Sequence, residues 1–568
     1  MILLFPTLKK GCGSGHLKRM IRLHHQLPDS AVYLEQNDNP VYFPLFDDCR
    51  ASVIIGTVPS EAKAVVFDNF RTTRSQLDRF PQEMVRIGVD EGGAARSRFD
   101  YLLDILPAVK KQQAPNYASL AFLNREDYKR RKRKTIKSIL VSFGGEDRAG
   151  LAQKTADYLQ AAGWHRKYRI TLLSPQLKAE SYPGFEIVSR IPDLSLRVTG
   201  WDLVLTHFGL TAFEALFQNV PVILINPTAY HHRLTLKAGL PEAGVGSVKT
   251  DVLEMYLSQP ELTESVSRPF LEMPRESLGQ FFEKRHFTGS PVCPVCGRRG
   301  KVMFRDKTRT VYRCRRCSLY YQLLFKEPEE RYREDYFFSE YRQSYGRTYL
   351  EDFDSISAMG EVRLDCLEPL RRTVQSDCRL RLLDVGCAYG PFLKAAAARG
   401  WEAAGCEVCT EAAEYVRKEF GIPVLSVPFE DHPENGLKFN AVTMWYVIEH
   451  FEHPGAVLEK VSRLLSSDGI LAFSTPNGSG WSARKSLRQF LEKSPEDHYT
   501  ILTPRGVRKI LKRYGFRVER IRITGIHPER IWNHRSAESL PPRLYRFLYH
   551  VFRLLKWGDT FEVYAKKK

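Results

Sequence analysis

An apolar strand that runs directly into a turn of small residues constrains the C-terminal half of this chain most strongly. The segment LLDVGCAYG ends its apolar run at Asp384 and continues through Gly386, Ala388 and Gly390. The first strand of a Rossmann-like sheet is buried on both faces, and the turn after it needs small residues so that backbone N–H groups can approach a ligand. Seventeen residues beyond Gly390, a second strand-like segment ends at Glu407, whose carboxylate suits the two hydroxyls of a ribose. The pattern predicts a nucleoside site.

Two ligands fit this geometry, a dinucleotide and S-adenosylmethionine, and the segments that follow favour the second. The strand-like run FNAVTMWYVIEH ends in Glu449 and His450, and the next one, GILAFSTPN, ends in Thr-Pro-Asn. Together with the glycine turn, these motifs resemble the class I S-adenosylmethionine-dependent methyltransferases, and the resemblance covers about residues 325–568. It implies a Rossmann-like fold and a methyl-transfer activity. The alternative is a nucleotide-binding fold that has lost its ligand.

The resemblance also implies roles for the residues around the expected cofactor. Asp384 and the glycine turn hold the methionine end of S-adenosylmethionine, and Glu407 holds the ribose. Phe429 and Glu430, in the segment PFE, border the adenine. Ala388 stands where the family commonly has glycine, and a small side chain there still permits a close approach to the ligand.

His450 is the candidate catalytic residue of this domain. It directly follows a strand, so we expect it at the carboxyl edge of the sheet, where ligands bind in such folds. Glu449 is expected to orient it, and a purely structural pair is the alternative. His498 and Tyr499 lie in a loop that, by the same resemblance, lines the acceptor pocket.

Four of the eleven cysteines form two Cys-x2-Cys pairs, CPVC and CRRC, separated by seventeen residues. This spacing is a strong zinc signal, and a closed shell of four thiolates leaves no position for an activated water, so the metal is expected to be structural. Disulfides are the alternative. A ribbon of this kind before the catalytic domain is similar to the front end of many methyltransferases of bacterial sugar and polysaccharide pathways. The predicted ligands are Cys293, Cys296, Cys314 and Cys317.

The first 285 residues alternate short apolar strands with helix-like segments, which predicts two doubly wound α/β halves. Glycines follow strands in GCGSGHLKRMIRL and SFGGED, and another opens a helix in THFGLTAFEAL. The N-terminus of a helix after such a turn can receive a phosphate or a sugar. The candidate nucleotide-sugar-binding residues at these turns are Gly13, Gly15, Gly144, Gly145, Gly209, Thr211 and Glu214.

These motifs resemble the two-lobed glycosyltransferase B fold and, more closely, the UDP-sugar hydrolases of the pseudaminic acid pathway. The resemblance implies that His16 is catalytic, that a UDP pyrophosphate lies near Gly209, and that Glu214 reaches its ribose. Two departures from the family pattern argue against hydrolytic activity more strongly than against sugar-nucleotide binding. The segment NPTAYHHRL replaces a glutamine-containing loop, and Asp90-Glu91 stands where two aspartates are frequent. A capping or binding role for His16 is the alternative.

Composition bounds the partners and the compartment. The chain has 568 residues, 43% of them hydrophobic and 27% charged, and no apolar run approaches the length of a membrane span. We expect a cytoplasmic protein. The net charge of +19 favours anionic partners in general. The basic run Lys129–Lys134 is expected to be a solvated linker rather than a nucleic-acid contact. Leu544–Trp557 fits either a late helix of the methyltransferase fold or a peripheral contact with an anionic membrane.

The sequence therefore predicts an α/β enzyme with two parts. In the leading hypothesis it is an S-adenosylmethionine-dependent methyltransferase of sugar or glycan biosynthesis, fused to a nucleotide-sugar hydrolase-like or glycosyltransferase-like region. The alternative is a methyltransferase of RNA or protein with a non-catalytic sugar-nucleotide-binding module. The sequence does not indicate the acceptor, the sugar or the oligomeric state. The expected domains are an N-terminal lobe at 1–127, a nucleotide-binding lobe at 135–285, a zinc ribbon at 290–325 and the methyltransferase at 326–568.

Overall fold

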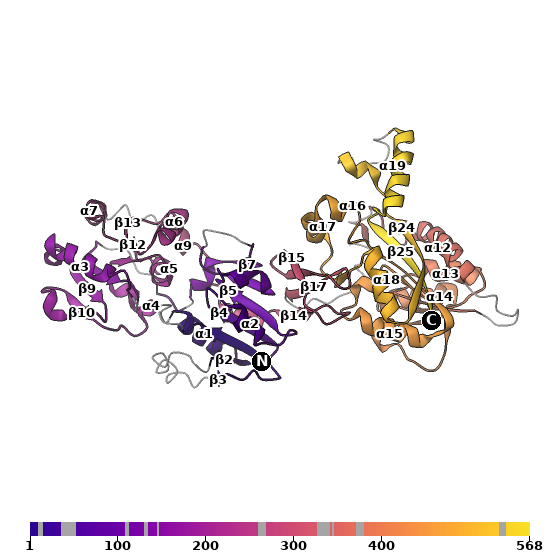
Figure 1. Ribbon diagram of the computed structural model, residues 1–568, viewed down its shortest axis with the longest axis horizontal. Helices are drawn as coiled ribbons and strands as arrows, with labels where there is room; N and C mark the ends of the chain where they lie inside the picture. Colours follow the sequence, from indigo (N-terminus) through magenta and orange to yellow (C-terminus); the bar gives the residue numbers. More distant parts are fainter. Residues whose placement is uncertain are drawn as a thin grey trace. The chain divides into compact units, whose positions relative to one another are not determined.

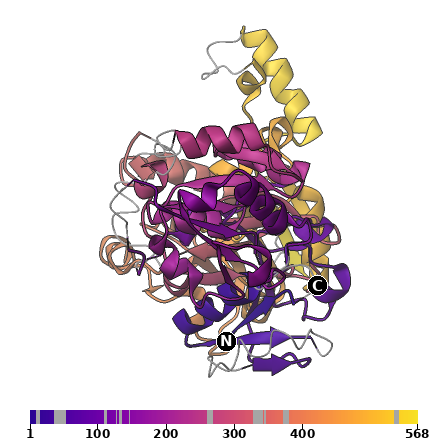
Figure 2. The same ribbon diagram turned by 90° about the vertical axis from the view of Figure 1, so that its left-hand side faces the viewer.

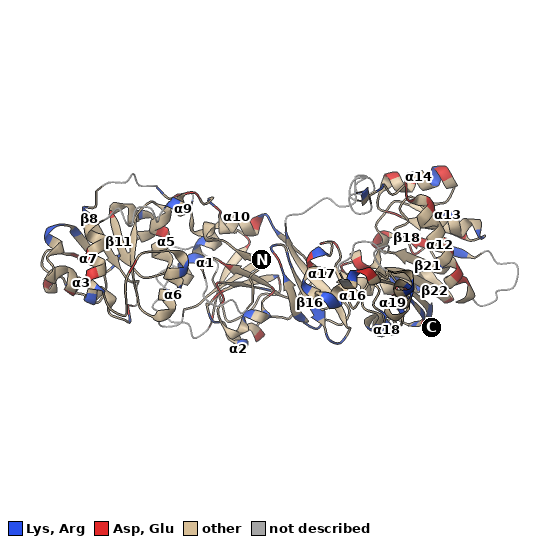
Figure 3. Cartoon of the chain, turned by 90° about the horizontal axis from the view of Figure 1, so that it is seen from above, with Lys and Arg blue, Asp and Glu red and all other residues tan. Residues whose placement is uncertain are grey.

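The structure is a computed structural model of the whole chain, in which the chain divides into two compact units, Met1–Arg285 and His286–Lys568 (Figure 1). Lys and Arg, like Asp and Glu, are distributed over both units (Figure 3). No helix among the described residues is long and apolar enough to cross a membrane. The described residues are 1–8, 15–35, 53–107, 113–125, 127–129, 135–144, 147–259, 268–326, 341–342, 346–370, 380–532 and 541–568.

The N-terminal unit begins with a seven-stranded parallel sheet in the order β3-β2-β1-β4-β5-β6-β7. Its central strands are wholly buried, as expected for strands covered on both faces. The elements are β1 (Ile2–Pro6), α1 (Gly15–Gln26), β2 (Ser30–Leu34), β3 (Val53–Ile55), β4 (Ala64–Asp68), α2 (Arg74–Asp78), β5 (Val85–Val89), β6 (Tyr101–Asp104) and β7 (Tyr117–Ala118).

A second parallel sheet follows, six-stranded in the order β10-β9-β8-β11-β12-β13. The last helix, α10, returns to the first sheet: the Phe281 ring stacks on Tyr117 at 5.4 Å, and Gly279 N donates to Gln26 Oε1 at 3.0 Å. The elements are β8 (Ser138–Ser142), α3 (Leu151–Ala161), β9 (Arg169–Leu173), β10 (Glu186–Val188), α4 (Leu194–Arg197), β11 (Leu203–Thr206), α5 (Leu210–Phe217), β12 (Val222–Asn226), α6 (Ala229–Ala238), β13 (Glu242–Val245), α7 (Thr250–Ser258), α9 (Arg268–Leu271) and α10 (Leu278–Glu283).

The main sheet of the C-terminal unit has seven strands in the order β20-β19-β18-β21-β22-β25-β24. All neighbours are parallel except β25, which is antiparallel to β22 and β24. The α/β prediction is confirmed, and this sheet is Rossmann-like. Its elements are α12 (Phe353–Leu367), β18 (Arg381–Val385), α13 (Pro391–Ala398), β19 (Glu402–Cys406), α14 (Thr410–Phe420), β20 (Val424–Leu425), β21 (Phe439–Trp445), α15 (Pro454–Leu464), β22 (Leu465–Pro476), α16 (Trp481–Lys485), α17 (Leu487–Lys493), α18 (Pro504–Arg513), β24 (Phe516–Thr524), α19 (Pro542–Leu555) and β25 (Thr560–Lys567).

A smaller antiparallel sheet holds the four cysteines and is joined to the main fold. It consists of β14 (His286–Gly289), β15 (Lys301–Arg305), β16 (Arg309–Cys314) and β17 (Leu319–Lys326). Strand β23 (Thr500–Ile501) pairs with β17, with Tyr320 opposite Ile501 and Tyr321 opposite Thr500. The cysteine sheet therefore extends beyond the predicted 290–325 and takes a strand from the later domain.

Some predicted residues lie outside the part of the chain that the structure describes. These are Gly13 of the first glycine turn, Gly145 of the second, and most of the basic run Lys129–Lys134. Their predicted roles stay predictions.

Candidate functional site

The turn between β18 and α13 is built as a backbone cradle. Gly386 and Gly390 both have left-handed backbones, with φ of 67° and 78°. A Cβ at Gly386 would lie 2.5 Å from Val447 Cγ2, and one at Gly390 would lie 2.8 Å from Val416 Cγ2. Ala388 also has a positive φ, 49°, although alanine adopts this conformation with strain. The backbone at this position therefore favours glycine.

Asp384 closes the inner end of this cradle. Its side chain is buried at the end of β18 and accepts a hydrogen bond of 2.6 Å from Thr443 Oγ1 on β21. Burial raises the pKa of Asp384 to about 7, although the Thr443 hydrogen bond and the Arg363 guanidinium act in the opposite direction. A cationic ligand group placed beside this carboxyl would therefore favour its ionised form.

Glu407, at the end of β19, ties the second strand to the turn. Its Oε2 accepts from Ala388 N at 2.8 Å and its Oε1 accepts from Cys409 N at 3.0 Å. Burial raises the pKa of Glu407, and these backbone donors lower it. Each carboxylate oxygen has a second lone pair, so the residue holds the turn and still has acceptor capacity for ribose hydroxyls.

The segment predicted to border the adenine forms the 3-10 turn Phe429–Asp431. The Phe429 ring is buried, lies 6.2 Å from Phe451, and has Lys460 Nζ 5.5 Å from its centre. Lys460 Nζ also donates to the backbone oxygen of Glu430 at 2.7 Å. The Glu430 side chain itself is exposed, so Phe429 supplies the surface suited to a base.

Tyr349 was not anticipated from the sequence. Burial raises the pKa of its phenol well above the usual value, and the charge of Asp384 adds to this effect. The ring lies 6.1 Å from that of Tyr389 in the glycine turn. It belongs to the segment before α12, where an aromatic-rich composition is the only signal and no motif marks the position.

The residues predicted to face the acceptor lie at the carboxyl ends of β21 and β22. Val447, which contacts Gly386, is followed by the 3-10 turn Ile448–His450. His450 Nδ1 lies 3.0 Å from Asp497 Oδ2, and the His450 and His498 rings are perpendicular with centres 4.8 Å apart. Burial lowers the pKa of His498 to about 3, and the neighbouring His450 adds to this. Both effects favour the uncharged form of His498 near neutral pH.

Glu449 is not the side chain that lies against His450 Nδ1. The prediction that it orients His450 is wrong about the partner, because the side chain on His450 Nδ1 is Asp497. Glu449 is fully buried, and neither carboxylate oxygen finds a hydrogen-bond partner among the described residues. Burial raises its pKa to about 7. The ligand atoms of Glu449, His450 and His498 lie within 4.8 Å of one another, close enough to hold a divalent cation.

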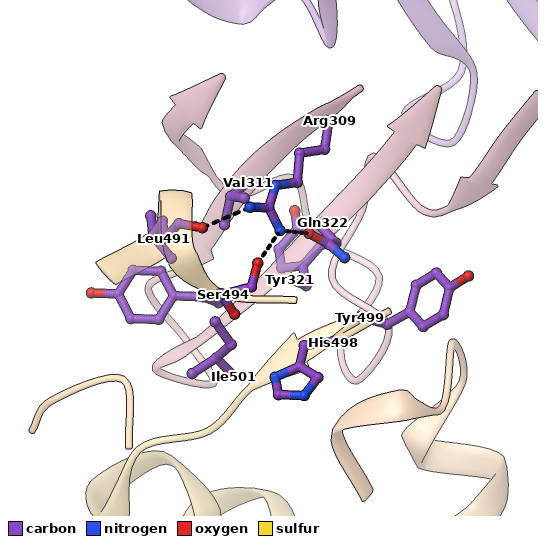
Figure 4. A pocket seen from close by; sticks show the side chains of 10 residues that line it. Arg309, Val311, Tyr321, Gln322, Leu491, Ser494, His498, Tyr499 and Ile501 are labelled. Carbon is purple, nitrogen blue, oxygen red and sulfur yellow. Dashed lines mark hydrogen bonds between the residues drawn. The ribbon is translucent and has the colours of Figure 1, made fainter. Parts of the chain in front are cut away.

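A small pocket beside His498 is lined by the cysteine sheet and by the segment after α17 (Figure 4). Arg309 crosses it and donates to the backbone oxygens of Leu491 at 2.8 Å and Ser494 at 2.9 Å. The buried guanidinium therefore fills this space, is satisfied by fixed backbone carbonyls, and ties the cysteine sheet to α17 and the turn after it.

Comparison with known proteins now adds to this geometry. Residues 346–521 match the family described as methyltransferase domain. Residues 346–521 therefore form an S-adenosylmethionine-dependent methyltransferase domain. The ubiquinone biosynthesis O-methyltransferase of Actinobacillus pleuropneumoniae serotype 5b is 30% identical over 135 residues, which are 22% of this chain and 56% of that protein. The protein of the same name from Colwellia psychrerythraea is 27% identical over 174 residues, 28% of this chain and 70% of that protein.

The chain thus spans little more than half the length of the first of these relatives. The crystal structure of a SAM dependent methyltransferase from Archaeoglobus fulgidus covers 40% of this chain and 98% of that one, at 16% identity and a TM-score of 0.29. The site residues predicted for the cofactor all lie inside the matched segment of the methyltransferase domain.

The four predicted zinc ligands converge just before the methyltransferase domain. All four Sγ atoms lie within 4.8 Å of one another, and Cys296 Sγ is 3.6 Å from Cys314 Sγ. Tetrahedral zinc with bonds of about 2.3 Å places thiolates roughly 3.8 Å apart, whereas a disulfide bond is about 2 Å long. Gly297, with φ of 69°, closes the first knuckle. The donor set and its spacing fit a structural zinc ion.

In the N-terminal unit, His16 is part of a charged network. His16 Nδ1 lies 2.6 Å from Asp68 Oδ1, at the end of β4. Arg19 donates to both oxygens of Asp68, at 2.6 and 2.7 Å, and to Asp90 at 2.8 Å. Burial alone raises the pKa of Asp68, but Arg19 and His16 hold it well below its usual range. Asp68 was not predicted, and its only sequence signal is its position at the end of an apolar strand.

The remaining predicted residues of this unit meet near two helix starts. A Cβ at Gly15 would lie 3.2 Å from Leu210 Cδ1, so the N-termini of α1 and α5 are close, and Thr211 lies in the first turn of α5. Gly144 and Gly209 both lie beside His207. A Cβ placed on Gly144 would lie 3.7 Å from His207 Nε2, and one placed on Gly209 would lie 3.1 Å from His207 Cε1.

Glu214 points to the opposite lobe of the same unit. Its Oε1 lies 3.7 Å from Arg22 Nη1, and burial raises its pKa. Glu214, which was expected to reach a ribose, is therefore paired with the Arg22 guanidinium in this structure.

Proposed function

We propose that the methyltransferase domain transfers the methyl group of S-adenosylmethionine to a hydroxyl oxygen and that His450 removes the hydroxyl proton. The observation that carries this proposal is the His450–Asp497 pair at the carboxyl edge of the sheet, one turn from the residue that contacts Gly386. A hydroxyl acceptor needs a base, and imidazole has a pKa near working pH. The relatives are named O-methyltransferases, which supports an oxygen acceptor.

S-adenosylmethionine, when bound, supplies an electrophilic methyl group on a sulfonium. The chain contributes alignment, since orientation of two reactants is worth up to about 7–11 kcal/mol. The glycine turn and Asp384 hold the methionine end, Glu407 holds the ribose, and Phe429 covers the adenine ring. His450 accepts the acceptor's proton at Nε2, while Asp497 holds Nδ1–H and stabilises the imidazolium that forms.

The ribose contact can be tested separately from catalysis. Glu407→Ala removes the ribose acceptor and leaves the Ala388 and Cys409 amides unpaired, so S-adenosylmethionine binding is expected to weaken by about 1–3 kcal/mol. Isothermal titration calorimetry measures this, with Glu414→Ala as the matched control because that carboxylate is exposed on α14. Equal affinity of Glu407→Ala and the parent would contradict the placement of the ribose.

For the acceptor we propose a sugar or glycan hydroxyl. The support is the preceding N-terminal unit, whose helix starts and charged network suit a nucleotide-linked sugar. Incubation of the full chain with labelled S-adenosylmethionine and a panel of UDP- and CMP-linked sugars, followed by mass spectrometry, tests this. Intermediates of ubiquinone biosynthesis form the comparison arm, because the relatives carry that name. Methylation confined to that arm would reject a sugar acceptor.

We propose a second activity, release or transfer of a nucleotide-linked sugar, for the N-terminal unit. The observation that favours it is the His16–Asp68 pair, in which a low-pKa carboxylate holds an imidazole at a helix start. His16→Gln should abolish turnover of a UDP-sugar and leave UDP binding within about twofold of the parent, because the nucleotide is expected at α5. Turnover that survives in His16→Gln would leave a binding module.

A further inference from the structure

Helix α19 has two chemically distinct faces. At 100° per residue, one face collects the apolar positions i, i+3, i+4, i+7, i+10 and i+11. The side of the helix next to this face collects Arg543, Arg546, His550 and Arg553, and Lys556 follows the helix. The sequence from Pro541 to Gly558 contains no acidic residue. The apolar face consists of Leu544, Phe547, Leu548, Val551, Leu554 and Leu555.

This apolar face is exposed within the described part of the C-terminal unit. Phe547 is 64% exposed and Leu554 81% exposed, and Leu544 and Leu555 are exposed as well. Phe552 is the buried residue of the helix. In both ribbon views α19 stands clear of the sheet and of the other helices of its unit (Figures 1 and 2). Large apolar side chains in such an arrangement indicate an interaction surface.

The C-terminal end of α19 is packed against the rest of the methyltransferase domain. Phe552 contacts the rings of Trp481 and Trp557 at 5.3 and 5.4 Å. Asn477, directly after β22, donates to the backbone oxygens of Lys556 and Gly558 at 3.3 and 2.8 Å. The helix is therefore rooted at the carboxyl edge of the sheet, the same edge that carries His450.

We propose that α19 docks the methyltransferase domain onto an anionic lipid bilayer, with its apolar face among the acyl chains and its arginines at the phosphate level. The charge pattern selects this occupant. An apolar groove of a protein partner or of a second copy would cover the leucines but would leave the row of arginines without a counter-charge. A helix whose apolar face of leucine and aromatic residues is flanked by arginines is the form that lies in a membrane interface. Docking there places the acceptor edge of the site toward the bilayer.

The test is flotation of the full chain with vesicles of phosphatidylglycerol and phosphatidylcholine, and with vesicles of phosphatidylcholine alone. The protein should float with the anionic vesicles, float at least about tenfold less with the neutral ones, and be released by high salt. Phe547→Glu with Leu554→Glu should abolish flotation, and Arg546→Glu with Arg553→Glu should reduce it about tenfold or more.

Two matched variants serve as controls. Leu236→Glu changes a leucine of the N-terminal unit that is 64% exposed, and Lys509→Glu changes an exposed cation of α18; both should float like the parent. Calorimetry with S-adenosylmethionine shows that the helix variants remain folded. Flotation unchanged in both double variants, or equal on both kinds of vesicle, would overturn the proposal. A protein that does not float, but forms a dimer that Phe547→Glu dissociates in analytical ultracentrifugation, would also overturn it. That result would assign the apolar face to a second copy of the chain.

Discussion

His450 Nδ1 lies 3.0 Å from Asp497 Oδ2, although the two residues are separated by 47 positions in the chain. The contact fixes the tautomer of the imidazole and directs Nε2 away from the carboxylate. In the proposed reaction, this pair takes the proton from the acceptor, and Asp384, Glu407 and the glycine turn hold the methyl donor.

Replacing His450 with Gln should lower kcat for an oxygen acceptor by about 10²–10⁴-fold, because a general base contributes on this scale. S-adenosylmethionine affinity should be unchanged, since the residue lies on the acceptor side. Asp497→Asn should give a smaller loss and shift the lower limb of the pH–rate profile, whereas a purely structural role would leave the profile in place. Prior treatment with a chelator separates the base from a cation. Activity that is lost on chelation while the zinc of the four cysteines is retained, and that a divalent metal restores, would contradict the base and assign the Glu449–His450–His498 group to a metal.

Asp384 should make the stability of the empty methyltransferase domain depend on pH. Its pKa rises from an ordinary 3.8 to about 7 in the folded domain, so the folded form binds more protons than the unfolded form between these values. The stabilisation is therefore complete below about pH 4 and is lost as pH rises through about 7, by roughly 1–3 kcal/mol. Urea unfolding of the compact 286–568 unit between pH 5 and 8 measures this, and Asp384→Asn should reduce the slope to the part that Glu449 contributes, whose pKa burial also raises to about 7. A parent and variant with the same slope would refute the assignment.

Much of the cofactor side could be predicted from the sequence because it is local. Asp384, Gly386, Ala388 and Gly390 follow one another in a single turn, and Glu407 ends the next parallel strand, so the order of elements brings them together. The partners of the two candidate catalytic histidines could not be predicted in this way. Asp497 and Asp68 meet His450 and His16 only through long-range packing, and the residue at His450 Nδ1 is Asp497 and not the motif neighbour Glu449. Tyr349 reaches the site from outside every motif.

Two substitutions in the glycine turn should act in opposite directions. Ala388→Gly should stabilise the methyltransferase domain by about 0.5–1 kcal/mol, because glycine adopts the φ of 49° without strain. Gly386→Ala should destabilise it by about 1–3 kcal/mol, because the new Cβ would meet Val447 and the backbone is left-handed. Thermal unfolding with and without S-adenosylmethionine measures both changes. Destabilisation by Ala388→Gly would show that the backbone argument is wrong.

One zinc ion per chain is expected at the four cysteines. Elemental analysis of protein purified without chelator should find it, and Cys314→Ser should lower the stability of the cysteine sheet by weakening the metal site. Because the cofactor turn lies elsewhere, this variant should still bind S-adenosylmethionine. Cys366→Ser, which changes a buried cysteine outside the cluster, is the matched control and should keep its zinc. Protein without zinc would reject the metal site.

The most direct test of the central claim is the position of the transferred methyl group. The full chain is incubated with S-adenosylmethionine that carries a deuterated methyl group and with the panel of nucleotide-linked sugars, and the products are fragmented by mass spectrometry. The account predicts one labelled methyl group on a sugar oxygen with the parent and none with His450→Gln. A label on nitrogen, a product that forms equally well with His450→Gln, or no labelled sugar from any member of the panel would contradict it.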